Sequence, residues 1–271
     1  PNGRRVLQYN MLQQYSGAWG NFGIDWYAAF GPLRLVGEAA LDVHGAPAVL
    51  ASAVWSPDYA FEASLTARCY SPSYIATHAG AWSTLSSVSN QVGATVAVQF
   101  VKGAWTLRMN ADCCHYPWKR YRAEAGTSSF KGRLQLLHSF RDASSLQAQL
   151  SWGGRIKGYV KLTSPLGGRL SAELRADANA GGLGGYAGVR WQASRSLGIS
   201  ARLTAWSTDG WDSRITYYEQ GVPQSFPIES YSGKGTGEYL LVKYSPSKRF
   251  ECQVKFQQGY VAYFVRIFIP G

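Results

Sequence analysis

The residues in this sequence most suggestive of chemistry are two adjacent cysteines and a histidine, Cys113, Cys114 and His115. Thiolate and imidazole groups bind zinc, which takes four ligands at a structural site. Successive side chains of a β-strand point to opposite faces, so Cys113 and Cys114 cannot readily ligate one ion if this segment is extended. No C-x-x-C or H-x-x-x-H spacing occurs elsewhere in the chain. We therefore expect no metal site and no cofactor.

An alternation of apolar and polar residues indicates that this segment is extended. Within residues 104–112, Trp105 falls on one face of a strand and Arg108 on the other, as a period of two requires. The same alternation recurs in residues 169–177 and 250–257. No segment longer than about a dozen residues has helical spacing. The elements that position any functional group are therefore expected to be strands.

The connections between these strands are of two kinds. The alternation predicts about 15 strands of roughly 8–12 residues, a length that spans a bilayer at the tilt of a barrel. Every second connection is tight, whereas the three long connections, 71–90, 113–129 and 207–237, all fall in the other set. Tight turns at one end and long loops at the other are typical of bacterial outer-membrane barrels. The predicted fold is all-β, an antiparallel transmembrane β-barrel of about 14–16 strands.

The predicted barrel occupies residues 1–271 as a single domain. Single-chain bacterial barrels have an even number of strands, so the odd count predicts either a miscounted strand or further strands before Pro1. We expect the chain to be the C-terminal part of a longer protein.

The composition agrees with a membrane barrel. Charged residues make up 16% of the chain, apolar residues 46% and aromatic residues 14%. No apolar run approaches the roughly 18 residues of a transmembrane helix. The net charge of +11 permits nucleic acid, lipopolysaccharide or acidic glycans as partners but selects none of them.

The alternation also assigns side chains to the two faces of the predicted barrel. The apolar set expected to face lipid is Trp105, Leu107, Leu170, Leu174, Phe250 and Val254, joined by Cys69, Cys113 and Cys252 as small apolar residues. The basic set expected to face the lumen is Arg108, Arg169, Arg175 and Lys255. Inward acids such as Glu173 partly cancel this charge, so we expect a modest preference for anions. No disulfide is predicted, because a disulfide needs close and well-aligned Cα atoms.

Acidic residues and one histidine in the long connections raise two further possibilities. The segment 207–213, STDGWDS, lacks the alternating oxygens and the twelfth-position Glu of an EF-hand. We expect Asp209, Arg214 and Glu219 instead to hold a long loop folded into the lumen. His78 has nearby serines but no G-x-S-x-G elbow accompanies it, so we predict no catalytic residues and no enzyme.

The segment HYPWKRYRAEAGTSSF, residues 115–130, resembles a strand-to-loop signature of phenylalanine-proline-tryptophan followed by a basic-tyrosine pair and a serine-glycine turn. That signature occurs in the outer-membrane β-barrel regions of Bacteroidota proteins whose N-terminal part carries competence-protein-like helix-hairpin-helix repeats. The matching positions are Tyr116, Pro117, Trp118, Lys119 and Tyr121. Cys113, Cys114 and His115 depart from the aromatic and basic residues usual there.

Two other long connections resemble the same family, in the same order along the chain. The first match consists of Arg68, Tyr70, Ser71, Pro72, Tyr74, His78, Ala79, Ala81, Trp82, Ser83, Asn90 and Gly93. The second consists of Thr208, Asp209, Ser213, Arg214, Ile215, Tyr218, Glu219, Phe226, Pro227, Tyr231, Gly233 and Gly235. The sequence departs from the family in two respects: it has no helix-hairpin-helix segment, and it ends on Ile269, Pro270 and Gly271 rather than on an aromatic residue.

The resemblance implies a non-enzymatic barrel in the bacterial outer membrane that acts as a pore or membrane scaffold. The implied partners are membrane lipid, DNA or another polyanion, and further outer-membrane proteins. The shared motifs imply that loop residues Tyr74, His78, Trp118, Asp209, Arg214, Tyr218 and Glu219 pack the long loops together at one end. A general or substrate-specific porin is the alternative, and a soluble β-domain that buries its apolar face is a third class.

Overall fold

The computed structural model describes residues 7–8, 11–12, 20–76, 80–223, 225–226, 228–247, 249–257 and 260–267. These residues form fifteen antiparallel strands in chain order, together with two short strands that pair separately. The predicted all-β antiparallel fold is confirmed. No helix in the described part of the chain is long and apolar enough to cross a membrane.

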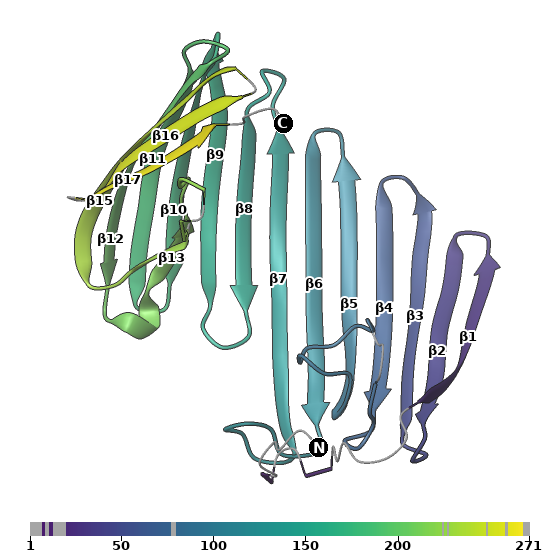
Figure 1. Cartoon of the computed structure of the whole chain (residues 1–271). Coiled ribbons are helices and arrows are strands. Elements are labelled where there is room, and N and C mark those ends of the chain that lie inside the picture. The colour runs from purple at the N-terminus through teal and green to yellow at the C-terminus, as the bar shows by residue number, and fades with distance from the viewer. Residues whose placement is uncertain are drawn as a thin grey trace. The chain divides into compact units, whose positions relative to one another are not determined.

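The chain divides into two compact units (Figure 1). Unit 1 comprises Pro1–Leu134 and Trp152–Gly154, and unit 2 comprises Gln135–Ser151 and Arg155–Gly271. The strand β7 (Thr127–Ser139) contributes residues to both units. Each unit is described by itself below.

Unit 1 contains six strands that pair with their chain neighbours. They are β1 (Asn21–Phe30), β2 (Leu33–Asp42), β3 (Pro47–Asp58), β4 (Phe61–Tyr70), β5 (Gln91–Lys102) and β6 (Trp105–Tyr116). Glycines with positive φ close two of the tight turns, Gly31 at 57° and Gly103 at 58°. Two-residue hairpins need such left-handed positions, which glycine adopts without steric cost.

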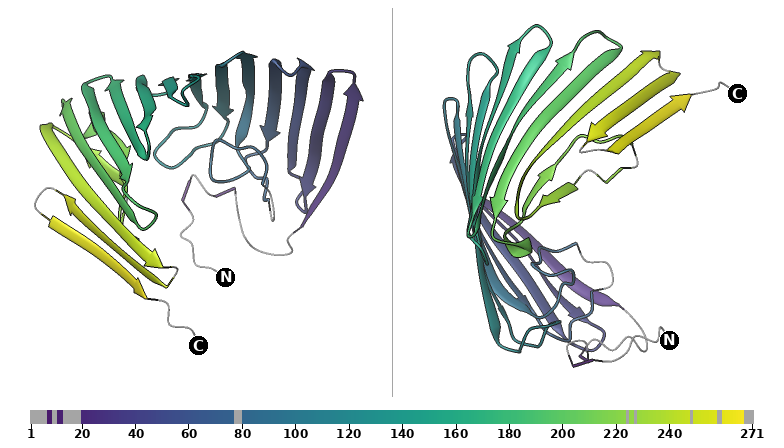
Figure 2. Two further views of the ribbon diagram at one scale, coloured as in Figure 1. Left: turned by 90° about the horizontal axis from the view of Figure 1, so that it is seen from above. Right: turned by 90° about the vertical axis from the view of Figure 1, so that its left-hand side faces the viewer.

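Unit 2 continues the same hairpin pattern. Its strands are β8 (Ser145–Trp152), β9 (Lys157–Gly167), β10 (Leu170–Asn179), β11 (Gly182–Gln192), β12 (Leu197–Thr208), β15 (Lys234–Ser247), β16 (Phe250–Gln257) and β17 (Tyr260–Ile267). Between β12 and β15 lie a short 3-10 turn, η1 (Trp211–Ser213), and a hairpin of β13 (Ile215–Tyr218) and β14 (Ile228–Tyr231). Figure 2 shows this hairpin lying over one face of the unit 2 strands.

Two of the predicted long connections have different bounds. The strand β6 continues through Cys113 and Cys114 to Tyr116, because its pairing with β5 extends to His115 opposite Val92. The second long loop is therefore 117–126 rather than 113–129. The third long connection is 209–233 rather than 207–237, because β12 ends at Thr208 and β15 begins at Lys234. It contains the β13–β14 hairpin, which the sequence did not predict.

The predicted segregation of the two faces is visible in both units. In β6, Cys113 is exposed and lies opposite Ala94, whereas Cys114 is fully buried opposite Gly93. The two thiols therefore point to opposite sides of the sheet, as the alternation predicts. The same register places apolar residues on one face, called here the apolar face, and charged residues on the other, called the polar face. The long loops fold onto the polar face.

Candidate functional site

The loop 71–90 folds back onto the polar face of unit 1. Its Trp82 indole Nε1 donates a hydrogen bond to Thr95 Oγ1 at 3.0 Å, and the Trp82 carbonyl accepts one from the Tyr70 hydroxyl at 2.9 Å. Tyr74 of the loop is buried in a cluster with Ala40, Tyr70 and neighbouring residues. The loop is thus packed against strands β2 to β5.

A single buried amide fixes the far end of this loop. Gln91 is fully buried, and its side-chain oxygen accepts from Thr84 N at 3.0 Å and from Thr84 Oγ1 at 2.9 Å. Its amide nitrogen donates to Ser83 Oγ at 2.6 Å and to the carbonyls of Ser87 and Ser89. Buried polar groups are destabilising unless they are hydrogen-bonded, and here the pairing orders the loop.

An ion pair lies beneath the loop 71–90. Arg68, whose side chain is fully buried, contacts Asp112 at 2.7 Å, and Thr95 Oγ1 donates to the same carboxylate at 2.6 Å. Gly93 makes room for it: a Cβ there would come within 3.1 Å of an Arg68 guanidinium nitrogen and 2.4 Å of the Cys113 carbonyl oxygen.

The loop 117–126 is tied to the end of the loop 71–90. Trp118 N donates to Asn90 Oδ1 at 2.7 Å, and Asn90 Nδ2 donates back to the Trp118 carbonyl at 2.9 Å. Asn90 adopts a positive φ of 55°, which asparagine tolerates better than most residues. These two long connections therefore form one packed loop cluster within unit 1.

Unit 2 carries its own folded loop, the β13–β14 hairpin. Ile215, Tyr217 and Tyr231 are buried against Tyr186 on the polar face, and the rings of Tyr186 and Tyr217 meet edge to face with centroids 5.0 Å apart. Gly184 provides the space, because a Cβ there would lie 2.6 Å from Ile215 Cδ1. Burial raises the pKa of Tyr217 and of Tyr231 above the usual range.

A buried ion pair anchors this hairpin to the sheet. Glu219 and Lys255 have side chains 2% and 6% exposed, and their charged atoms are 3.0 Å apart. The Tyr231 hydroxyl donates to the other oxygen of Glu219, which raises the pKa of Tyr231 further. Each oxygen of the Glu219 carboxylate thus has a partner, as a buried charge requires.

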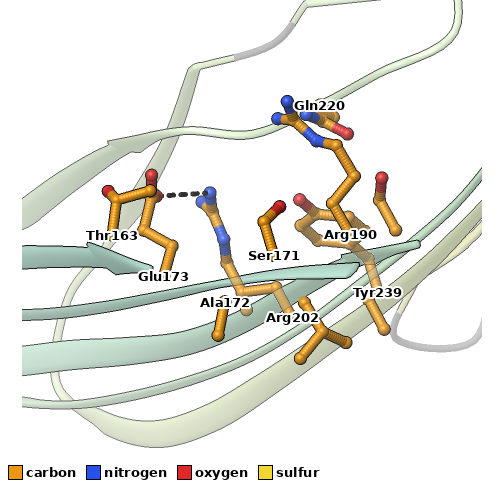
Figure 3. A pocket seen from close by; sticks show the side chains of 12 residues that line it. Thr163, Ser171, Ala172, Glu173, Arg190, Arg202, Gln220 and Tyr239 are labelled. Carbon is orange, nitrogen blue, oxygen red and sulfur yellow. Dashed lines mark ion pairs between the residues drawn. The ribbon is translucent and has the colours of Figure 1, made fainter. Parts of the chain in front are cut away.

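The remaining charges on the polar face of unit 2 are largely paired. Glu173 accepts a hydrogen bond from Tyr186 and faces Lys161 at 3.6 Å and Arg202 at 3.7 Å. Arg175 pairs with Asp177 at 2.7 Å and stacks over the Tyr159 ring at 3.9 Å. A small cavity lies beside these groups and is lined by Arg190 and Arg202 (Figure 3).

The structure separates the predicted basic set into two kinds of residue. Arg175 and Lys255 are ion-paired against the sheet. Arg108 is exposed and donates to Gln99 Oε1 at 2.8 Å. Arg169 is exposed because it lies in the turn between β9 and β10, outside both strands.

The predicted loop-packing residues also differ from one another. Tyr74, Trp118 and Glu219 make the contacts described above. Tyr218 does not pack as expected and is 69% exposed, because the alternation of β13 turns Tyr217 toward the sheet instead. Asp209 and Arg214 are exposed as well, and Arg214 stacks over the neighbouring Trp211 ring at 4.7 Å.

Several of these residues could not be predicted from the sequence, and one predicted residue lies outside the described part of the chain. His78 belongs to the part of the chain that the structure does not describe. The roles of Gln91 and Tyr217 were not anticipated, since Gln91 is the first residue of β5 and Tyr217 lies in the four-residue strand β13, where no long periodic pattern surrounds them. Gly93 and Gly184 could have indicated where other segments pack on the sheet, because glycine within a strand often marks a close approach of another part of the chain.

Comparisons with known proteins give a likeness of structure but none of sequence. No protein-family model matches the chain, and no curated protein matches it. The chain is similar to the crystal structure of the siderophore receptor PirA from Acinetobacter baumannii, with a TM-score of 0.44 and 8% sequence identity. The match covers 92% of this chain and 54% of that chain, so the chain spans about half the length of the receptor structure.

Proposed function

We propose that the chain forms a β-barrel in the outer membrane of a bacterium and acts there as a pore or membrane scaffold, without catalysis. One observation carries this proposal: in both units one face of the sheet is apolar and exposed, whereas the ion pairs and folded loops lie on the other face. A soluble β-domain has the reverse arrangement, with its large apolar side chains packed inside.

The exposed apolar side chains are numerous and large. In unit 1 they include Phe22, Ile24, Val49, Leu65, Val92, Val96, Leu107 and Met109, and in unit 2 Val160, Leu162, Leu174, Val189, Leu203, Leu240 and Phe256. The largest apolar patch on a typical soluble monomer is roughly 300–600 Å². Lipid is the environment in which such a face is stable.

Strand length and aromatic residues favour the same environment. Most strands contain 10–12 residues, and at about 3.3 Å per residue and a tilt near 45° they cover roughly the 25 Å apolar band of a membrane barrel. Aromatic side chains gather on the apolar face beside the tight turns: Phe30, Trp55, Phe61, Phe100 and Trp105 in unit 1, and Trp191, Tyr244 and Phe250 in unit 2. Aromatic girdles of this kind mark membrane interfaces.

A matched pair of substitutions tests the proposed environment. Met109 and Asn110 are neighbours near the middle of β6 and point to opposite faces. In lipid vesicles, Met109→Arg should lower the free energy of unfolding by about 2–4 kcal/mol, the cost of arginine on a lipid face near mid-membrane. Asn110→Arg should lower it by less than about 1 kcal/mol. Equal effects, measured by urea titration with tryptophan fluorescence, would contradict the membrane assignment.

Conductance in a planar bilayer separates the two forms of the proposal. A pore gives discrete current steps, whereas a scaffold gives none. A porin is the alternative function, and the polar cavity of unit 2 favours a porin that transports a particular solute.

The link to DNA that the resemblance implies stays a separate prediction. Filter retention of DNA that weakens steeply as salt rises would support it.

A further inference from the structure

The cavity in unit 2 lies on the polar face of β9 to β12 and β15, beneath the loop that follows β13 (Figure 3). Its polar lining includes Ser171, Glu173, Arg190, Ser200, Arg202 and Gln220. The free volume is about 90 Å³. This volume is enough for a small polar group.

The cavity has an excess of positive charge. Arg190 forms no ion pair with any described residue, and the side chain of Arg202 is nine-tenths buried with no hydrogen-bond partner for its Nε among them. The acid in the cavity, Glu173, is already engaged by Tyr186, Lys161 and Arg202. An additional anionic group would therefore be favoured there.

Gln220 covers Arg190. In the amide orientation that satisfies both groups, the Gln220 side-chain oxygen accepts from Arg190 Nε at 3.1 Å and from its Nη2, and the amide nitrogen donates to Ser200 Oγ at 2.8 Å. An oxygen bound to the edge of a guanidinium takes the place that a carboxylate or phosphate oxygen occupies in a charge-assisted pair. The amide is neutral, so it is a weaker partner than an anion would be.

The neighbours of Gln220 hold it in this position. Glu219 is fixed by Lys255 and Tyr231, and Val222 is buried with Tyr239 and Leu241. The loop therefore places the Gln220 side chain over the cavity.

We propose that Arg190, together with Ser200 and Arg202, binds the oxyanion group of a small solute, a carboxylate or a phosphate, and that Gln220 closes the site until the anion displaces its amide. The inference rests on the proposed pore only for the route by which the solute arrives. Binding itself is measurable on the folded chain in detergent micelles, without a membrane.

Isothermal titration calorimetry with inorganic phosphate and with acetate, at constant ionic strength, tests the site. Arg190→Gln should weaken binding of the preferred anion at least tenfold, and Arg190→Lys should weaken it severalfold because lysine keeps the charge but not the fork geometry. The matched control is Arg108→Gln, which removes an exposed arginine from the polar face of unit 1 and should leave binding unchanged. Equal weakening by both glutamine variants would overturn the site and indicate a general effect of charge.

The two anions distinguish the source of the oxyanion, and Gln220→Ala tests the closing role. Stronger binding of phosphate or of acetate identifies the solute class. Gln220→Ala should bind the anion severalfold more tightly, since a competing oxygen is lost, and unchanged or weaker binding would overturn the closing role. Far-ultraviolet circular dichroism confirms that each variant is folded. Anion binding without bilayer conductance would refute the pore and support the anion site. Conductance without anion binding would refute the anion site and support the pore.

Discussion

The two loops that fold onto the polar face are anchored by different chemistry. In unit 1, the loop 71–90 is fixed mainly by neutral groups, with the Gln91 amide and the hydroxyls of Ser83 and Thr84 at its centre. In unit 2, the β13–β14 hairpin is fixed by the buried Glu219–Lys255 pair and by packed tyrosine rings. Removing one partner leaves an unpaired amide in the first case and an unpaired charge in the second.

This difference is confined to the polar face. The apolar face has the same character in both units, with large exposed aliphatic residues between tight turns and loops. A lipid-like environment requires only apolar side chains, so the apolar face does not distinguish the two units. The specialised contacts, including the cavity at Arg190, all lie on the polar face, and that is where function should be tested.

The largest effect is expected from Glu219→Ala. It leaves the Lys255 ammonium buried without a partner, which typically costs about 3–5 kcal/mol. Amide hydrogen exchange in residues 215–231 should then speed up by roughly 10²–10⁴-fold, as measured by mass spectrometry. Asp212→Ala is the control, since Asp212 meets Arg155 at 3.6 Å with both side chains at least half exposed. That exposed pair should contribute less than about 1 kcal/mol.

A smaller effect is expected from Gln91→Ala in unit 1. It leaves neutral donors and acceptors of the loop 71–90 unpaired, which costs about 1–3 kcal/mol. Exchange in residues 80–90 should accelerate by roughly ten- to a hundredfold. Gln99→Ala, in the same strand and on the same face, removes only a bond to the exposed Arg108 and should have little effect. A loss as large as that of Glu219→Ala would contradict the proposed difference between the two anchors.

The strands were predictable from sequence because their signal is local and repeated. A period of two over eight or more residues fixes which side chains of a strand share a face, and within β6 it placed Trp105 and Arg108 on opposite faces without any tertiary information. The residue at which β6 ends was less clear from the sequence. The segment 113–116 contains two cysteines and a histidine, which blur the alternation, and its pairing with β5 determines that it is a strand.

The loop anchors were predictable only in part because they depend on distant residues. Glu219 and Lys255 are 36 positions apart, and nothing in either segment indicates that they meet. Gln220 acquires its role from the packing of Val222 and from the position of Arg190 on β11. Loop residues of this kind are positioned by the sheet beneath them, which a single sequence does not reveal.

Alkaline pH should loosen the hairpin more steeply than the loop 71–90. Burial raises the pKa of Tyr217 and Tyr231 in the hairpin, and of Tyr74 in the loop. A tyrosine whose pKa is raised by folding contributes stability that is fully present below about pH 10, where the unfolded residue ionises, and is lost as pH rises further. Each such tyrosine changes stability by about 1.4 kcal/mol per pH unit in that window, so the loop that buries more of them has the steeper slope.

The slope can be measured as the change with pH in the rate of cleavage within each loop, between pH 9 and pH 11, with a protease that is active at alkaline pH. Tyr231→Phe removes one of the two titrating hydroxyls and should reduce the hairpin slope by about half. Tyr218→Phe is the matched control, because Tyr218 is exposed in the same hairpin and should leave the slope unchanged. Lys255 is present in all three proteins, so their difference isolates the tyrosine. If Tyr231→Phe kept the full slope, the Tyr231 hydroxyl would not be a source of the hairpin's alkaline sensitivity.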